Sequence, residues 1–160
     1  MRVVALCLAL LAQSTALTVG VTGAGGKTGS LCYQQLAADS RVDAAIPFVR
    51  DASSKKTLKV LPDAPLVEAD VTGSASAFAA VLKEKKVDAL LIATSAVPQI
   101  KKRSIAKVLL LKLIPFVKGG RPEFRFRPGG TPEEVDWVGQ KAQIDAAKEA
   151  GVKHVVICSS

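Results

Sequence analysis

The chain has 160 residues, of which 49% are hydrophobic and 4% aromatic, and its formal net charge is +8. This length allows one domain with a buried core. Nine Lys or Arg and a single acid lie within residues 101–127, whereas the rest of the chain balances 13 basic against 13 acidic residues. Such a local excess of charge argues against a general nucleic-acid-binding protein.

The three cysteines are Cys7, Cys32 and Cys158, and their spacing is unlike that of a metal site. We therefore expect no bound metal. Cys32 and Cys158 fall within apolar segments, so we interpret them as core residues.

Residues 1–16 have the pattern of a targeting segment. Met1-Arg2 precedes an apolar run over residues 3–12, and small residues stand at Ser14 and Ala16. This order is typical of a signal peptide with a cleavage site, and the run is too short to span a bilayer. We expect a secretory or plastid destination. The alternatives are a misassigned start codon or a helix before the domain, with a cytoplasmic location. After this segment we expect one domain, which covers residues 17–160.

Apolar strands alternate with helical patterns along the rest of the chain. The expected strands are 17–22, 44–49, 66–69, 87–93 and 154–158, and the expected helices are 26–38, 53–59, 74–86 and 131–150. Thr131 and Glu134 form a capping box around Pro132, and Gly151 ends the helix that they open. This alternation predicts an α/β fold with a doubly wound parallel sheet.

The first strand runs directly into a glycine-rich turn, VGVTGAGGKTG over residues 19–29. A G-x-x-G-x-x-G pattern fits Gly23, Gly26 and Gly29, whereas the stricter G-x-G-x-x-G fails because Thr28 stands at its last position. The first glycine allows the turn, the second lets backbone amides approach a pyrophosphate, and the third lets the helix pack closely. The expected diphosphate-binding residues of this NAD(P)-binding Rossmann fold are Gly23, Gly25, Gly26, Lys27, Thr28 and Gly29.

A phosphate loop of the nucleotide-hydrolase type is the nearest alternative. Its G-x-x-x-x-G-K-[ST] pattern matches Gly26-Lys27-Thr28, but Val21 stands where the first glycine is required. The strand over residues 87–93 leads into Thr94, whereas a hydrolase needs an Asp there to support magnesium. The dinucleotide interpretation is therefore favoured over the hydrolase and over a turn without a ligand.

Ligands of such sheets bind at the carboxyl ends of the strands. Arg50 follows the second strand, where an arginine favours the 2′-phosphate of NADP and an acid would favour NAD. A solvent-exposed arginine is the alternative. Asp70 follows the third strand, and it either accepts a hydrogen bond from the adenine or is a surface turn residue.

Several segments resemble the atypical short-chain dehydrogenase/reductase proteins of plants, algae and cyanobacteria, which are NAD(P)-binding and NmrA-like. The resemblance covers residues 17–160 and is carried by Val21–Gly29, Asp70–Thr72, Asp88–Pro98, Gly120–Phe124, Val135–Lys148 and Gly151–His154. It implies an extended Rossmann fold that binds NADP(H).

Individual roles are also implied by this resemblance. Gly23, Gly26, Lys27 and Thr28 would contact the pyrophosphate, Arg50 the 2′-phosphate, Asp70 and Val71 the adenine, and Thr94, Ser95 and Ala96 the ribose region. Trp137, Gln140 and Lys141 lie in the helix that borders the cofactor, although Trp137 is equally well interpreted as a packing anchor. Ala142 replaces the family's usual Asn, so any polar role there is lost.

Two departures from the family concern chemistry. The family continues beyond the position of Ser160, so we expect a C-terminally truncated domain that exposes an apolar sheet edge and face. The superfamily's Tyr-x-x-x-Lys pair is missing, because Tyr33 is the only tyrosine and Ala37 stands four residues after it. Ser159 and Ser160 remain the candidates for catalytic residues.

Residues 99–119 form a basic and apolar insertion. Three interpretations are open. The insertion is an amphipathic helix that binds an anionic membrane or a partner, a lid over the substrate cleft, or a loop that packs on the domain. Similar insertions in algal relatives favour the last two, so a membrane surface is the weaker alternative.

The leading hypothesis is an NADP(H)-dependent oxidoreductase of unknown small-molecule substrate, present as its cofactor-binding part. NAD is the less favoured coenzyme. The alternative function is a non-catalytic NmrA-like sensor or scaffold that binds NADP.

Overall fold

The computed structural model describes residues 17–101, 103–105, 108 and 121–158. The expected targeting segment, Ser159, Ser160 and most of the 99–119 insertion lie outside these residues. The strands are β1 (Thr18–Thr22), β2 (Ala44–Val49), β3 (Val67–Glu68), β4 (Ala89–Ile92), β5 (Gln99–Ile100), β6 (Phe124–Arg125) and β7 (His154–Ile157). The helices are α2 (Lys27–Ala38), α3 (Lys55–Val60), α4 (Ala75–Glu84), the π-helix η1 (Glu133–Gly139) and α6 (Gln140–Ala150).

Five strands form one parallel sheet in the order β3-β2-β1-β4-β7. The chain moves outward from β1 to β3 and then crosses back to β4 on the other side of β1. This reversal is a topological switch point, where ligands of open α/β sheets bind. The predicted fold class and all five predicted strands are confirmed, with β3 and β4 somewhat shorter than expected.

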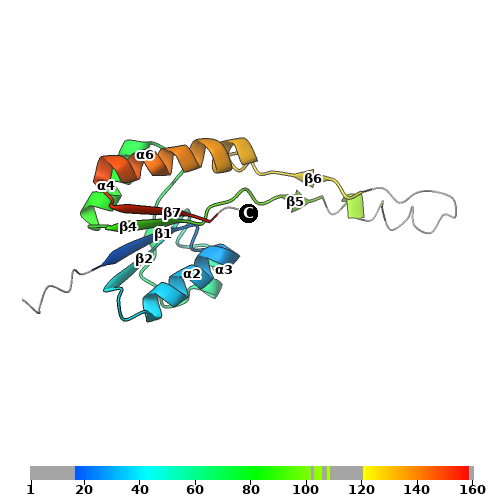
Figure 1. Cartoon of the computed structure of the whole chain (residues 1–160). Helices are drawn as coiled ribbons and strands as arrows, with labels where there is room; N and C mark the ends of the chain where they lie inside the picture. Colours follow the sequence, from blue (N-terminus) through cyan, green and yellow to red (C-terminus); the bar gives the residue numbers. More distant parts are fainter. Residues whose placement is uncertain (1–16, 102, 106–107, 109–120, 159–160) are drawn as a thin grey trace, which may run out of the picture.

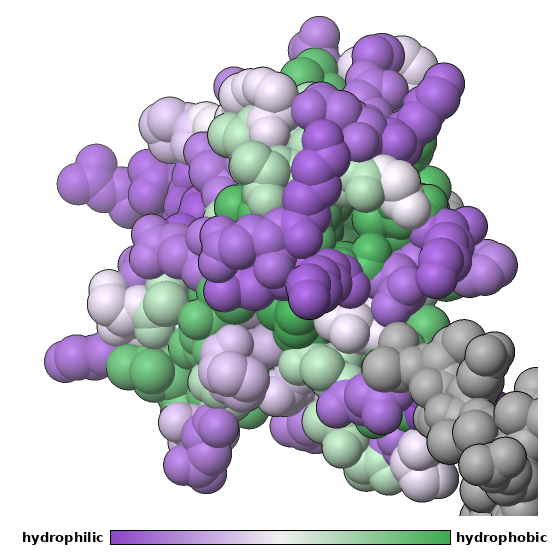
Figure 2. Space-filling model, turned by 90° about the vertical axis from the view of Figure 1, so that its left-hand side faces the viewer, coloured by the Kyte–Doolittle hydropathy of each residue, from purple (hydrophilic) through white to green (hydrophobic). Residues whose placement is uncertain are grey.

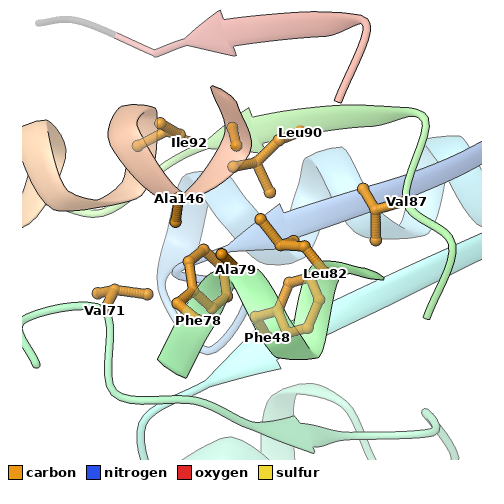
Figure 3. Close-up of a cluster of buried hydrophobic side chains, with 10 residues drawn as sticks. Phe48, Val71, Phe78, Ala79, Leu82, Val87, Leu90, Ile92 and Ala146 are labelled. Carbon is orange, nitrogen blue, oxygen red and sulfur yellow. The ribbon is translucent and has the colours of Figure 1, made fainter. Parts of the chain in front are cut away.

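The helices cover both faces of the sheet (Figure 1). On one face, α4 and α6 enclose a cluster that includes Phe48, Phe78, Leu82 and Leu90 (Figure 3). The rings of Phe48 and Phe78 meet edge to face, with centroids 5.3 Å apart. Such a pair adds about 1 kcal/mol beyond its buried area. On the other face, Val21, Ala24, Val49 and Leu61 form a second core cluster, against which residues of α2 and α3 pack. Both layers therefore bury β1, the central strand of the sheet.

The long helix after the insertion begins as the sequence predicts. Thr131 Oγ1 and the Thr131 amide both donate to Glu134 Oε2, at 2.8 and 3.1 Å, and the Glu134 amide donates to Thr131 Oγ1 at 3.2 Å. These bonds complete the capping box. The helix ends at Gly151, whose φ of 75° gives the expected left-handed C-cap. Its first part, η1, is a π-helix, a feature that periodicity did not predict.

Strand β5, at the start of the insertion, pairs with β6, which follows it, in a two-stranded antiparallel ladder that extends away from the carboxyl ends of the main sheet (Figure 1). Ile100 and Phe124 are paired in this ladder, and 47% and 55% of their surfaces are exposed. Both side chains are thus about half exposed. Because most of residues 99–119 lie outside the described chain, the membrane, lid and packing interpretations stay predictions. No helix among the described residues is long and apolar enough to cross a membrane.

Strand β7 lies at one edge of the sheet, where it pairs with β4. Val155, Val156 and Ile157 are each at least 40% exposed. The expected apolar edge is therefore present in the described chain. By contrast, polar residues cover most of the side of the molecule at which the strands begin (Figure 2). Hydrophobic residues are visible on that side mainly in the gaps between polar residues.

Candidate functional site

The turn between β1 and α2 is built around Gly23. Its φ is +69°, and a Cβ on this residue would lie 2.6 Å from the Ala93 carbonyl oxygen and 3.0 Å from the Thr94 amide nitrogen. Both atoms belong to backbone that follows β4, so they have little freedom to move away. Only glycine fits this turn, which brings the end of β1 against the end of β4.

The start of α2 packs equally closely on this turn. A Cβ on Gly29 would overlap the Gly23 carbonyl oxygen and would lie 3.1 Å from the Ala24 Cα. The Gly26 amide donates to that same carbonyl at 2.8 Å and closes the turn. Gly25 contacts α3, because a Cβ there would lie 3.3 Å from Thr57 Oγ1. The glycines therefore leave a backbone cradle at the head of α2.

The N-terminus of α2 has the features of an anion site. Gly26 is its N-cap, no side chain caps it, and its first turn contains no acid. Lys27 and Thr28 are exposed beside it. Unpaired amides at a helix N-terminus attract negative charge, and a lysine adds to this attraction. The cradle and this helix end together fit the diphosphate of a dinucleotide.

The residues after β2 and β3 lie at the same edge of the sheet. Asp70 Oδ1 accepts hydrogen bonds from the Thr72 amide at 2.9 Å and from Thr72 Oγ1 at 2.7 Å. These bonds lower the pKa of Asp70, and the charge of Arg50 lowers it further. The ionised carboxylate therefore stabilises the fold above its unfolded-state pKa, and this contribution is lost as the pH falls. Arg50 is exposed, whereas the side chain of Val71 is buried in the core cluster.

Two polar side chains that the sequence analysis did not single out hold the loop after β4. Asp136 Oδ1 accepts a hydrogen bond from the Ala96 amide at 2.9 Å. Gln143 is fully buried, and its Nε2 donates to Thr94 Oγ1 at 3.1 Å and to the Gly139 carbonyl at 3.0 Å. Gln143 Oε1 has no hydrogen-bond partner among the described residues. These contacts fix η1 and α6 against the loop of Thr94, Ser95 and Ala96.

We expect Asp136→Ala to lower the free energy of unfolding by about 1–2 kcal/mol, because the half-buried Ala96 amide loses its acceptor. Urea unfolding would measure this change. Asp136→Asn, which keeps an oxygen at the same place, should recover most of the loss. Asp145→Ala is the matched control, since Asp145 forms an exposed ion pair with Lys141 on the same helix and should cost less than about 0.5 kcal/mol. Equal losses for Asp136→Ala and Asp145→Ala would contradict the assigned contact.

A pocket of about 360 Å³ lies along the start of α6, and its lining residues are Asp136, Trp137, Gln140, Lys141 and Ile144. Trp137 is 71% exposed, so its interpretation as a packing anchor is wrong within the described chain. Gln140 reaches this pocket, and its helix touches the Ala96 loop through Asp136. The part of the chain that the structure describes contains no group of three or more His, Cys, Asp or Glu that could hold a metal ion.

Comparison with known proteins identifies the family of this chain. A family model described as NAD(P)H-binding matches residues 23–160. The chain is 43% identical over 159 residues to an uncharacterised chloroplastic protein of Arabidopsis thaliana, a match covering 99% of this chain and 44% of that protein. It is 34% identical over 155 residues to sanguinarine reductase of Eschscholzia californica, covering 92% of this chain and 55% of that protein. The chain thus spans about half the length of these relatives.

Solved structures show the same fold. A UDP-glucose 4-epimerase from Stenotrophomonas maltophila with bound NAD superimposes with a TM-score of 0.56 at 20% identity, covering 90% of this chain and 37% of that one. A short-chain dehydrogenase from Streptomyces avermitilis gives 0.52 at 20% identity, covering 91% and 49%. With the family model and the curated relatives, these neighbours confirm the resemblance to NAD(P)-binding short-chain dehydrogenase/reductase-like proteins, and the chain belongs to the NAD(P)H-binding family.

Proposed function

We propose that this chain binds NADP(H) as the coenzyme-binding part of an atypical short-chain dehydrogenase/reductase. The observation that carries this proposal is the glycine cradle at the head of α2. Backbone atoms crowd Gly23 and Gly29, and the helix end beyond them is uncapped and next to Lys27. An oxidoreductase is further supported by the similarity to sanguinarine reductase.

Each predicted residue has a role in this proposal that its position allows. The amides of Gly25, Lys27 and Thr28 hold the diphosphate beside the Lys27 side chain, whereas the Gly26 amide closes the turn on the Gly23 carbonyl. Asp70 has a carboxylate oxygen left for the adenine, whereas Val71 offers only its backbone because its side chain is in the core. The loop of Thr94, Ser95 and Ala96 borders the ribose, and Gln140 faces the reactive end from α6. When bound, the coenzyme supplies or accepts a hydride.

NADP is the proposed coenzyme because of Arg50. Its exposed guanidinium follows β2, at the carboxyl edge of the sheet, and its charge reaches Asp70. A planar cation with several donors suits a phosphate monoester better than it suits a ribose hydroxyl. Among the described residues, no acid forms an ion pair with Arg50.

Titration of the folded protein with NADPH, NADH and magnesium ATP tests the proposal directly. We expect saturable binding of NADPH, weaker binding of NADH and no binding of magnesium ATP, measured by nucleotide fluorescence and by calorimetry. Magnesium ATP binding without NADPH binding would instead support the nucleotide-hydrolase alternative. Folded protein that binds neither nicotinamide coenzyme would refute the proposal.

A non-catalytic NADP sensor is the second candidate function. It is favoured by the position of Tyr33, which lies on α2 and packs against the second core cluster. In addition, Ala37 stands where a Tyr-x-x-x-Lys pair starting at Tyr33 would have its lysine. Hydride transfer distinguishes the two functions. NADPH binding without turnover of any carbonyl or quinone in a substrate panel would favour the sensor, and turnover would favour the enzyme. In the enzyme, Ser159 and Ser160 are proposed to hold a substrate oxygen.

A plastid location is proposed from the chloroplastic relative and from the signal-like pattern of residues 1–16. Fusion of these residues to a fluorescent reporter tests this assignment.

A further inference from the structure

Cys32 and Cys158 are 126 positions apart in the sequence, yet the fold brings their thiols together. The sequence predicts core positions for both. Both are instead partly exposed and in no disulfide, and they lie close enough that Cys158, after burial, raises the pKa of the Cys32 thiol. The contact joins the second turn of α2 to the end of β7.

The sheet register explains why Cys158 points toward α2. β7 pairs with β4 so that Val156 lies beside Leu91, and the Cys158 amide continues the pairing by donating to the Ile92 carbonyl at 2.9 Å. Because side chains alternate along a strand, Cys158 shares a face with Val156 and Leu91. Leu91 packs with α2 residues in the second core cluster. Cys158 therefore lies on the face that α2 covers.

The helix periodicity explains the other half of the contact. Gly29 is buried at the start of α2, and Leu36 packs in the second core cluster. Cys32 is three residues after the first and four before the second, so it lies on the same face of the helix. Two independent patterns, one in the strand and one in the helix, thus direct both thiols into the same space.

We propose that Cys32 and Cys158 form a reversible disulfide, a redox-sensitive cross-link between α2 and β7. A small-molecule disulfide is the oxidant. The thiolate of one cysteine attacks it, which breaks the reagent's S–S bond, forms a mixed disulfide and releases one reagent thiol. The second cysteine then attacks the protein sulfur of the mixed disulfide, which forms the Cys32–Cys158 bond and releases the other reagent thiol. The two thiol protons end on the two released thiols.

The environment of Cys32 suits it to the second of these steps. Burial raises the pKa of the Cys32 thiol, and the neighbouring Cys158 raises it further. A raised pKa lowers the thiolate fraction and slows attack on a reagent in solution. Once Cys158 carries a mixed disulfide, proximity compensates for this low fraction.

The test uses the full chain and a Cys7→Ser variant, each reduced and then incubated with oxidised glutathione. After alkylation of free thiols, peptide mapping should find a Cys32–Cys158 link in both proteins. The intact mass should fall by the two hydrogens lost, and dithiothreitol should reverse the change. Closing so long a loop should raise the Tm by at least about 5 °C. Separate glutathione adducts on Cys32 and Cys158, or links through Cys7 instead, would overturn the proposal.

Single variants provide the matched controls. Cys32→Ser and Cys158→Ser should each stop at a glutathione adduct on the remaining thiol of the pair, with no rise in Tm. Circular dichroism of the reduced variants shows whether they are folded. A Tm rise of the same size in a folded Cys32→Ser variant would also overturn the proposal. If either variant fails to fold, the mapping of the full chain still decides.

Discussion

Replacing Gly23 with alanine is expected to weaken NADPH binding by about 100-fold and to lower the free energy of unfolding by about 3 kcal/mol. Two effects add in the unfolding free energy. A non-glycine residue in the left-handed region costs about 1–2 kcal/mol, and a Cβ placed 2.6 Å from the Ala93 carbonyl oxygen costs about as much again. The loss of affinity follows because the turn must shift to relieve the overlap, which displaces amides that would hold the diphosphate.

Gly129→Ala is the matched control for this prediction. Gly129 has the same φ of +69°, but a Cβ there would meet no atom within 4 Å. It should therefore cost only the backbone term and leave NADPH binding unchanged. Urea unfolding and fluorescence titration of both variants measure these effects. If the two variants lose equal stability and neither loses affinity, then the close approach of the β1 turn to the end of β4 has no part in binding.

Arg50→Glu is expected to weaken NADPH binding by about 100-fold while changing NADH binding by less than about threefold. A charge-assisted bond from the guanidinium to the 2′-phosphate contributes about 1.5–3 kcal/mol, and the new carboxylate repels the phosphate. NADH lacks this phosphate, so its affinity should not follow. Arg50→Lys should have an intermediate effect, since it keeps the charge but loses the planar fork.

Lys148→Glu controls for the change in net charge. Lys148 is exposed on α6, so the substitution alters the overall charge of the protein by the same amount at a site remote from the carboxyl edge of β2. It should change neither affinity, because screening removes distant surface charges. Parallel losses of NADPH and NADH affinity in Arg50→Glu would show that Arg50 does not read the 2′-phosphate.

The parts of the fold that local patterns determine could be predicted from the sequence. The apolar run after Lys86 predicts β4 because a central parallel strand is buried on both faces. Thr131 and Glu134 predict a helix start, since each satisfies a backbone amide of that helix. Gly23 predicts a turn because its backbone conformation excludes other residues. Each of these signals acts within a few residues, which is the range that sequence patterns can report.

Contacts across long sequence separations could not be predicted. The Asp136–Ala96 and Gln143–Thr94 bonds span 40 and 49 residues, and nothing in the pattern of the helix shows which of its polar side chains will be buried. The pairing of Cys32 with Cys158 depends on both the strand order and the strand register. The sequence predicts that each strand exists, but tertiary packing determines which residues lie side by side.

The π-helix η1 changes the direction in which its own side chains point relative to those of α6, in the helix that follows the capping box. An α-helix turns by about 100° per residue, and a π-helix accommodates more residues in each turn. Without this wide segment, Asp136 would face a different direction relative to α6, and it could not reach the Ala96 amide while Gln143 holds Thr94. Removing Val138, which lies between Asp136 and Gln143, should therefore uncouple the two anchors, even though both side chains would still be present.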